Sequence, residues 1–163
     1  MASASAPASE ANFGPDPEPA SAAAPDAAAW SDLAGWQALL ARHAGLFEAW
    51  AEGGAVGIVP RAAADAGDGA MLVWTRRRGA MRAEWRRFGG FADCGVAVLF
   101  VAEPEALAEV HARLGENALG QMKLQLRQGG MLLYVLAPKS QLLDDGYEDF
   151  LETLGLAFMG ACR

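Results

Sequence analysis

Two strand-like runs joined by a glycine constrain the fold of this chain more than any other feature. Residues 71–78 and 81–88 have the length and composition of β-strands, and Gly79-Ala80 separates them. Glycine at the first of two turn positions is what a type II′ turn requires, so we predict a hairpin with that turn. This register places Trp74 opposite Trp85, an aromatic cross-strand pair. We therefore expect the chain to contain an antiparallel sheet.

The predicted hairpin also carries the strongest charge feature of the chain. Six of the thirteen basic residues fall between positions 76 and 87, where Glu84 is the sole acid, so this segment has a net charge of +5 while the whole chain has −7. Such a local concentration of positive charge in an acidic chain is typical of a surface that binds something anionic. Because arginines fall on both faces near the turn, we expect the tip to stand in water. Our candidate binding residues are Trp74, Arg76, Arg77, Arg78, Arg82, Trp85, Arg86 and Arg87.

The first 29 residues differ in composition from the rest of the chain. Ala, Pro and Ser supply 21 of these 29 positions, and Phe13 is the one aromatic side chain. Such a segment cannot bury enough apolar area to offset the cost of ordering its backbone, about 1–2 kcal/mol per residue. We predict a disordered tail over residues 1–29, either a solvated extension or a docking peptide. A single globular domain is expected over residues 30–163.

The globular part begins with a helical pattern. Apolar side chains from Leu33 to Trp50 recur at alternating spacings of three and four, which is the seam of an amphipathic helix. Ser31 is a good N-cap and Gly53-Gly54 is a stop signal, so we predict one helix across this range. The seam is too short for a coiled coil of its own. We expect it to pack on a sheet, or on its copy in a dimer.

Further strands and helices alternate along the rest of the chain. Residues 55–60 predict a short strand, and residues 95–102, apolar throughout, predict a central strand with both faces covered. Residues 61–70, rich in Ala, Gly and Asp, predict a loop. Pro104 opens a helix, and Ser140 caps a final one. The apolar stripe of that final helix comprises Leu143, Tyr147, Phe150, Leu154 and Phe158.

The stretch from 121 to 128 is ambiguous between helix and strand. Met122, Leu124 and Leu126 alternate with polar side chains, and this period of two favours a half-exposed strand over a continued helix. Gly129-Gly130 then leads into an apolar run that predicts another strand. We therefore predict a second hairpin here.

The predicted order is helix, four strands, helix, two strands, helix. Helices segregated from a largely antiparallel sheet define the α+β class, so we predict one α+β domain of about five to six strands packed by three helices. This order is similar to that of the small acidic chaperones of type III secretion, whose helix, three strands, helix, two strands and helix form dimers. Size and a pI near 4.8 agree with that resemblance, which covers residues 30–163 and implies a dimeric α+β fold. It assigns no role to any residue.

No motif for catalysis, a cofactor or a metal site is recognised in the sequence. Neither histidine, His43 or His111, has a partner at metal-ligand spacing. Cys94 and Cys162 match no metal or redox spacing, so we expect reduced thiols. The glycine-rich stretches lack the spacing of a phosphate-binding loop. We predict a non-enzymatic protein with no cofactor and no metal; whether His43, His111 and Cys94 converge is left open.

Composition also limits the cellular compartment and the classes of partner that we expect for this chain. The longest apolar run, residues 96–102, is far shorter than the roughly 18 residues of a membrane-spanning helix. The N-terminus lacks the basic start and apolar stretch of a signal peptide, so we expect a cytoplasmic protein with no membrane partner. The overall acidity argues against a nucleic-acid coat protein, although a local basic patch can still bind an anion.

The arginine hairpin supports three interpretations. Its tryptophans can pack inward while the arginines are simply solvated. The hairpin can dock an acidic protein partner, which would make the chain a small adaptor or chaperone-like accessory protein. It can also bind nucleic acid or another polyanion. We expect a homodimer, because an acidic face on the final helix can pair with the hairpin of a second copy. That face comprises Asp145, Glu148, Asp149 and Glu152.

Overall fold

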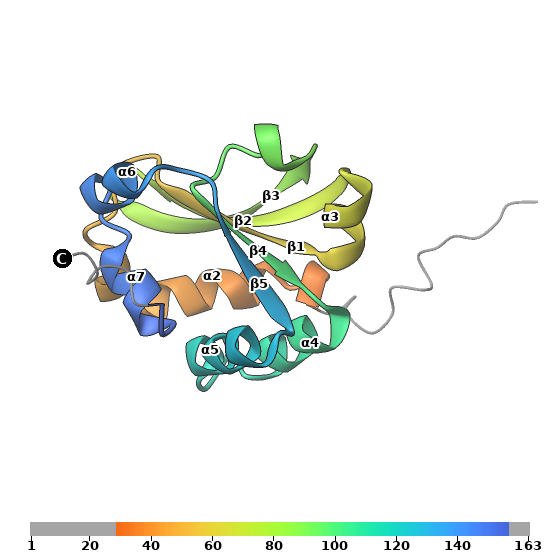
Figure 1. Cartoon of the computed structure of the whole chain (residues 1–163). Helices are drawn as coiled ribbons and strands as arrows, with labels where there is room; N and C mark the ends of the chain where they lie inside the picture. Colours follow the sequence, from red (N-terminus) through yellow and green to blue (C-terminus); the bar gives the residue numbers. More distant parts are fainter. Residues whose placement is uncertain (1–28, 157–163) are drawn as a thin grey trace, which may run out of the picture.

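Within residues 29–156, one mixed sheet of five strands organises the fold (Figure 1). The computed structural model describes residues 29–156, so the predicted tail lies outside the described residues except for Ala29. The strand order is β3-β2-β1-β4-β5, and every neighbouring pair is antiparallel except the parallel pair β1 and β4. The predicted α+β class with a largely antiparallel sheet is confirmed. The strands are β1 (Ala55–Pro60), β2 (Gly69–Arg77), β3 (Ala80–Phe88), β4 (Val98–Ala102) and β5 (Met131–Val135).

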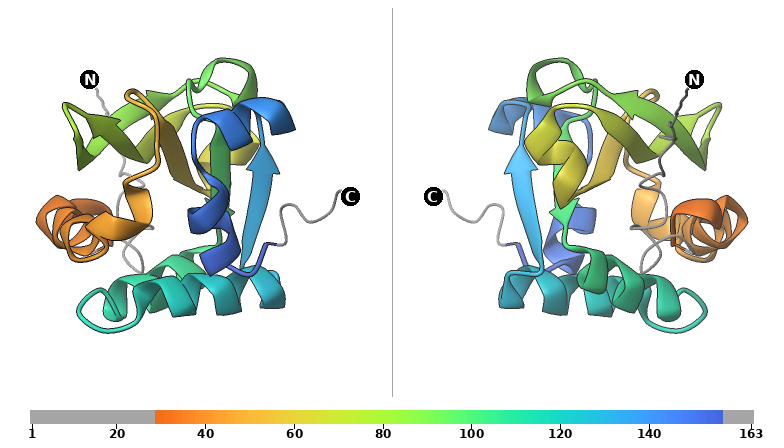
Figure 2. Two further views of the ribbon diagram at one scale, coloured as in Figure 1. Left: turned by 90° about the vertical axis from the view of Figure 1, so that its left-hand side faces the viewer. Right: turned by 90° about the vertical axis from the view of Figure 1, so that its right-hand side faces the viewer.

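Helices cover the two faces of this sheet unequally (Figures 1 and 2). The larger core lies under one face and contains Trp36, Trp74 and Phe150, all fully buried. The helices on that face are α2 (Leu33–Arg42), α4 (Pro104–Ala112), α5 (Ala118–Gln128) and α7 (Glu148–Thr153). A smaller core lies on the other face around Met71 and Phe88. That face is covered by α3 (Arg61–Ala66) and the 3-10 helix η3 (Phe91–Asp93).

The predicted first helix is shorter than its apolar seam. α2 ends at Arg42, and a 3-10 helix, η2 (Ala44–Phe47), carries the chain onward. The seam nevertheless remains inside, because Phe47 and Trp50 are both buried. The N-cap is Asp32 rather than Ser31, since its carboxylate accepts a hydrogen bond from the backbone nitrogen of Gly35 at 2.9 Å. The prediction of one continuous helix to Gly53-Gly54 was therefore wrong in length but right in its buried face.

The predicted strand at 121–128 is wrong, because these residues belong to α5. Asn117 caps this helix by accepting from the backbone nitrogen of Gly120, and Gly129 ends it in the left-handed region at φ 88°. Met122 and Leu126 are four residues apart, so both face the large core, whereas Leu124 is 41% exposed. The alternation that favoured a strand is thus a helical stripe with one apolar residue left outside. The order that suggested the chaperone resemblance therefore loses one strand.

Two further elements differ from expectation. Residues 61–66 form α3 instead of a loop, because the alanine-rich segment starts after Pro60 and stops at Gly67 in the left-handed region. The final helix is divided into α6 (Lys139–Asp144) and α7 by Gly146 at φ 82°. A Cβ at Gly146 would clash with the Ala49 carbonyl oxygen, so the close approach of the 49–51 segment enforces the break.

Candidate functional site: an arginine surface on the β2–β3 hairpin

The hairpin forms as predicted, but its turn and register are shifted. Arg77 pairs with Ala80, so Arg78 and Gly79 occupy the turn with φ of 54° and 76°. Positive φ at both positions is typical of a type I′ turn, not type II′. The carboxylate of Glu52 accepts hydrogen bonds from both turn nitrogens, which stabilises Arg78 in this uncommon conformation. No local pattern in the sequence signals this contact, because Glu52 lies 26 residues before Arg78.

The shifted register separates the two tryptophans. Trp74 lies opposite Ala83 and Trp85 lies opposite Leu72, so the predicted Trp74–Trp85 pair is wrong. Trp74 is fully buried against Trp36, with ring centroids 6.1 Å apart. Trp85 is half-buried, and its ring lies 5.3 Å from that of Trp30. Both indoles face the α2 side of the sheet, so they pack inward as one of the three interpretations proposed.

Two arginines on the opposite face of the hairpin share one carboxylate. Arg77 makes two contacts of 3.0 Å with the two oxygens of Glu84, and Arg86 Nε donates to Glu84 Oε2 at 2.7 Å. The Arg77 side chain is 52% exposed and that of Glu84 is 25% exposed. Such solvent-exposed ion pairs contribute about 0–1 kcal/mol to stability. Their geometry therefore fixes the side chains on the surface more than it stabilises the fold.

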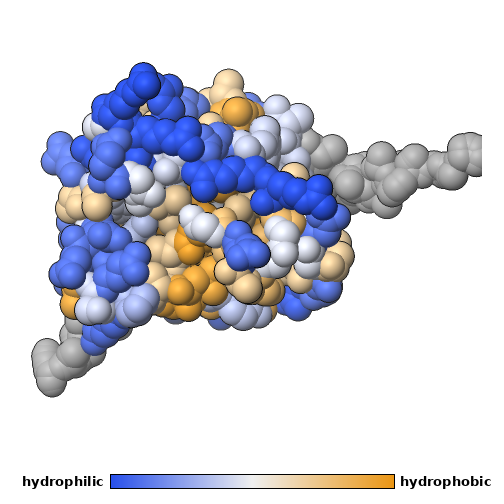
Figure 3. Space-filling model, turned by 90° about the horizontal axis from the view of Figure 1, so that it is seen from above, coloured by the Kyte–Doolittle hydropathy of each residue, from blue (hydrophilic) through white to orange (hydrophobic). Residues whose placement is uncertain are grey.

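A third arginine on this face has no carboxylate partner among the described residues. Arg82 is exposed and lies opposite Thr75, on the same face of β3 as Glu84 and Arg86. Within residues 29–156, its guanidinium makes no ion pair, and neither does that of Arg78 at the turn. We define the arginine surface as Arg77, Arg78, Arg82 and Arg86. Figure 3 shows strongly hydrophilic side chains in a band across this side of the molecule.

The two remaining predicted arginines have structural contacts elsewhere. Arg76 points to the α2 side, where its Nη1 donates to the Phe47 carbonyl at 3.0 Å and holds the end of η2. Arg87 lies at the far end of β3 and pairs with Asp68 at 2.7 Å, with its side chain 79% exposed. The structure therefore brings together four of the eight predicted binding residues, and it assigns Trp74 and Arg76 to packing and anchoring.

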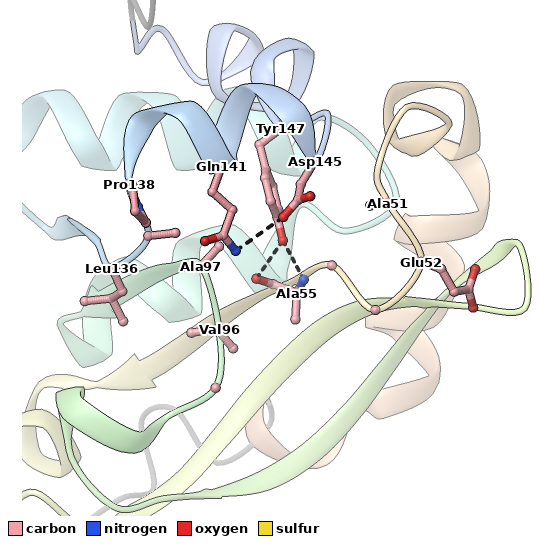
Figure 4. Close-up of a pocket in the computed structure, with 14 residues that line it drawn as sticks. Ala51, Glu52, Ala55, Val96, Ala97, Leu136, Pro138, Gln141, Asp145 and Tyr147 are labelled. Carbon is pink, nitrogen blue, oxygen red and sulfur yellow. Dashed lines mark hydrogen bonds between the residues drawn. The ribbon is translucent and has the colours of Figure 1, made fainter.

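A hollow of about 340 Å³ lies at the start of β1, near Tyr147 and on the side of β1 where Glu52 caps the hairpin turn (Figure 4). The Tyr147 hydroxyl bonds to the backbone of Ala55, at 2.8 Å from its nitrogen and 3.4 Å from its oxygen. Burial raises the pKa of Tyr147, an effect that its bond to Ala55 partly offsets and that nearby Asp145 reinforces. The phenol group is thus neutral and fully engaged, and it serves to join α7 to β1.

A second basic area lies away from the hairpin. A hollow of about 420 Å³ is lined by Arg113 of the loop after α4 and by Lys123 and Arg127 of α5. Arg113 lies 4.0 Å from Glu109 on the preceding turn, so part of this charge is offset. These residues are spread over several turns of two elements and do not form a run, so no local charge pattern in the sequence indicates them.

The residues considered for catalysis do not form one site. His111 Nε2 lies 2.8 Å from Asp32 Oδ2 on the α2 side of the sheet, whereas Cys94 is buried in the smaller core on the other side. The hydrogen bonds from His111 and from the backbone of Gly35 lower the pKa of Asp32. Burial, reinforced by Arg42, lowers the pKa of His43. Among residues 29–156, no group of three His, Cys, Asp or Glu side chains is placed to hold a metal ion.

Comparisons with known proteins identify a distant structural likeness. No protein-family model matches the sequence, and no curated protein matches it. A similar solved structure is that of TT1886 from Thermus thermophilus, a conserved hypothetical protein described as possibly a sterol carrier protein. It is 18% identical, covers 83% of this chain and 91% of that chain, and gives a TM-score of 0.39. None of the helices in residues 29–156 combines the length and the apolar character that a membrane-spanning helix requires.

Proposed function

We propose that the chain is a non-enzymatic accessory protein, a small cytoplasmic adaptor or chaperone-like module, that docks an acidic protein partner through the arginine surface. The observation that carries this proposal is the exposed guanidinium of Arg82, which forms no ion pair with any carboxylate of residues 29–156. On the same face, Arg77 and Arg86 share the carboxylate of Glu84. A carboxylate of a partner would complete the pairing that the described residues leave open.

An acidic protein fits this surface better than a single-stranded nucleic acid does. Non-specific recognition of single strands combines basic side chains with aromatic rings on which bases stack. Here Trp74 is fully buried and Trp85 packs on Trp30, so neither ring forms a free platform beside the arginines. Arginine forks match a carboxylate in two-point contacts without such a platform.

Fluorescence anisotropy with a labelled oligoglutamate peptide tests the proposal. We expect Arg82→Glu to weaken binding about tenfold, since it replaces attraction by repulsion and 1.4 kcal/mol corresponds to a factor of ten. Arg113→Glu is the matched control, because it makes the same charge change in the second basic area. Equal affinity of wild type and Arg82→Glu, or a larger loss in the control, would overturn the proposal. Tighter binding of labelled oligothymidine than of the peptide would assign the surface to nucleic acid instead.

A further inference from the structure

The outer edge of β5 presents backbone groups that no described strand pairs. The backbone nitrogen of Leu136 donates to the Ala97 carbonyl at 2.8 Å, and that of Glu103 donates to the Gly130 carbonyl at 2.9 Å. These two bonds show which residues of β5 form hydrogen bonds with β4. Because hydrogen-bonding direction alternates along an antiparallel strand, even-numbered residues of β5 pair with β4. The nitrogen and oxygen of Leu133 and Val135 therefore point away from the sheet, where no described strand lies (Figure 2).

The other edge of the same sheet is covered at Met81 and Ala83. On β3, the Gln37 side chain of α2 takes the place of a neighbouring strand, since its amide nitrogen donates to the Met81 carbonyl at 2.9 Å and its amide oxygen accepts from the Ala83 nitrogen at 2.8 Å. Four charged residues also project from β3, namely Arg82, Glu84, Arg86 and Arg87. Covering groups and edge charges are the usual protection against unwanted strand pairing. β5, with the sequence MLLYV, has neither a charge nor a proline.

Exposed apolar side chains gather around this open edge. Tyr134 is 40% exposed, Val135 51% and Leu136 36%. Phe91 of η3 is 37% exposed, and its ring centroid lies 5.0 Å from that of Tyr134. The space-filling view shows an apolar area beside the hydrophilic band on this side of the molecule (Figure 3). A clustered apolar patch next to an unpaired strand edge is typical of an interaction surface.

We propose that the open edge of β5 pairs with β5 of a second copy of this chain, antiparallel about a two-fold axis at Leu133. In this register the outward-facing residues bond to one another, so that Val135 of each copy lies opposite position 131 of the other. No charged residue of either strand lies in the pairing. The two sheets would join into one, and the open edge of each would disappear.

Charges on the flanking segments favour a second copy as the occupant. The segment that enters β5, residues 121–130, carries Lys123 and Arg127 and no acid. The segment that leaves it, residues 136–149, carries four acids and one lysine. Antiparallel pairing brings the entering segment of one copy toward the leaving segment of the other, so opposite net charges approach at both ends of the interface. This pairing is independent of the arginine surface, which lies on β2 and β3.

Light scattering of the full chain over a series of dilutions tests this pairing. We expect a mass of twice 17.1 kDa at high concentration and the monomer mass on dilution. Val135→Pro removes an outward backbone donor at an edge position where proline is tolerated, and Val135→Lys places a charge there. Both variants should be monomeric with an unchanged circular dichroism spectrum. Leu124→Lys, which adds the same charge at an exposed leucine on α5, should remain dimeric.

Three results would overturn the β5 pairing. A wild-type monomer at every concentration would show that a second copy does not occupy the edge. A dimer that survives both Val135 variants would place the contact elsewhere. If Arg82→Glu abolishes the dimer and Val135→Lys does not, the dimer contact lies between the acidic final helices of one copy and the arginine hairpin of the other.

Discussion

The amide oxygen of Gln37 lies 2.8 Å from the backbone nitrogen of Ala83, where a sixth strand would otherwise bind. The amide nitrogen of the same side chain satisfies the Met81 carbonyl. One glutamine on α2 thus covers the edge of the sheet at Met81 and Ala83 and fixes the helix against the hairpin that carries the arginine surface. The two edges of the sheet therefore differ: β3 is covered at Met81 and Ala83, whereas no described side chain bonds in this way to the outer edge of β5.

Replacing Gln37 should therefore destabilise the fold and expose β3. We expect Gln37→Ala to lower the free energy of unfolding in urea by about 1–3 kcal/mol, because a half-buried donor and acceptor lose their partners. Gln121→Ala on α5 is the control, since it removes an amide for which no hydrogen bond to the sheet is seen in the described residues. It should change stability by less than about 0.5 kcal/mol. Equal stability of the wild type and Gln37→Ala would contradict this role.

The bond between Tyr147 and Ala55 predicts a loss of stability on removing the hydroxyl. Tyr147→Phe leaves the buried Ala55 nitrogen without its acceptor, so we expect a cost of about 1–3 kcal/mol at neutral pH. Burial raises the pKa of Tyr147 in the folded state. The unfolded phenol ionises near pH 10, so this residue should lose stabilising effect as pH rises above that value. Denaturation series of both proteins at neutral and alkaline pH will show whether the variant has the shallower decline.

His43 predicts a second pH dependence, on the acid side. Its Nε2 is buried without a hydrogen-bond partner within residues 29–156, and burial together with Arg42 lowers its pKa below 6.5. Between the lowered pKa and about 6.5 the unfolded chain binds more protons than the folded one, so stability falls as pH decreases through this range. His43→Gln should flatten that slope in urea titrations between neutral and mildly acidic pH. Parallel slopes for the two proteins would rule out His43 as the cause.

The sheet was more predictable from the sequence than the helices were, for physical reasons that particular residues show. The hairpin and the central strand have strong local signals, namely glycine at the turn and the continuous apolar run near Phe100. The apolar spacing from Met122 to Leu126 is compatible with both a strand and a helix. The Asn117 cap and the packing of this segment on the core stabilise the helix. The Gly146 break could not be foreseen, because it depends on the approach of Ala49 from a distant part of the chain.

The candidate site was predictable in composition but not in arrangement. The count of arginines between 76 and 87 identified a basic surface, and the alternation of β3 correctly grouped Arg82 and Arg86 with Glu84. The division into an exposed surface and an inward pair, Trp74 and Arg76, depends on α2 and η2 covering one face. The long-range contact between His111 and Asp32 left no signal in the sequence, since 79 positions separate the two residues.

Mapping backbone amide shifts by NMR while oligoglutamate is added would test most directly whether the arginine surface binds acidic partners. We expect the largest amide shift changes on β2 and β3 around Arg77, Arg82 and Arg86. The Arg82→Glu variant should not show these shift changes. Changes centred on Arg113, Lys123 and Arg127 instead, or no changes at low salt, would contradict the proposed function.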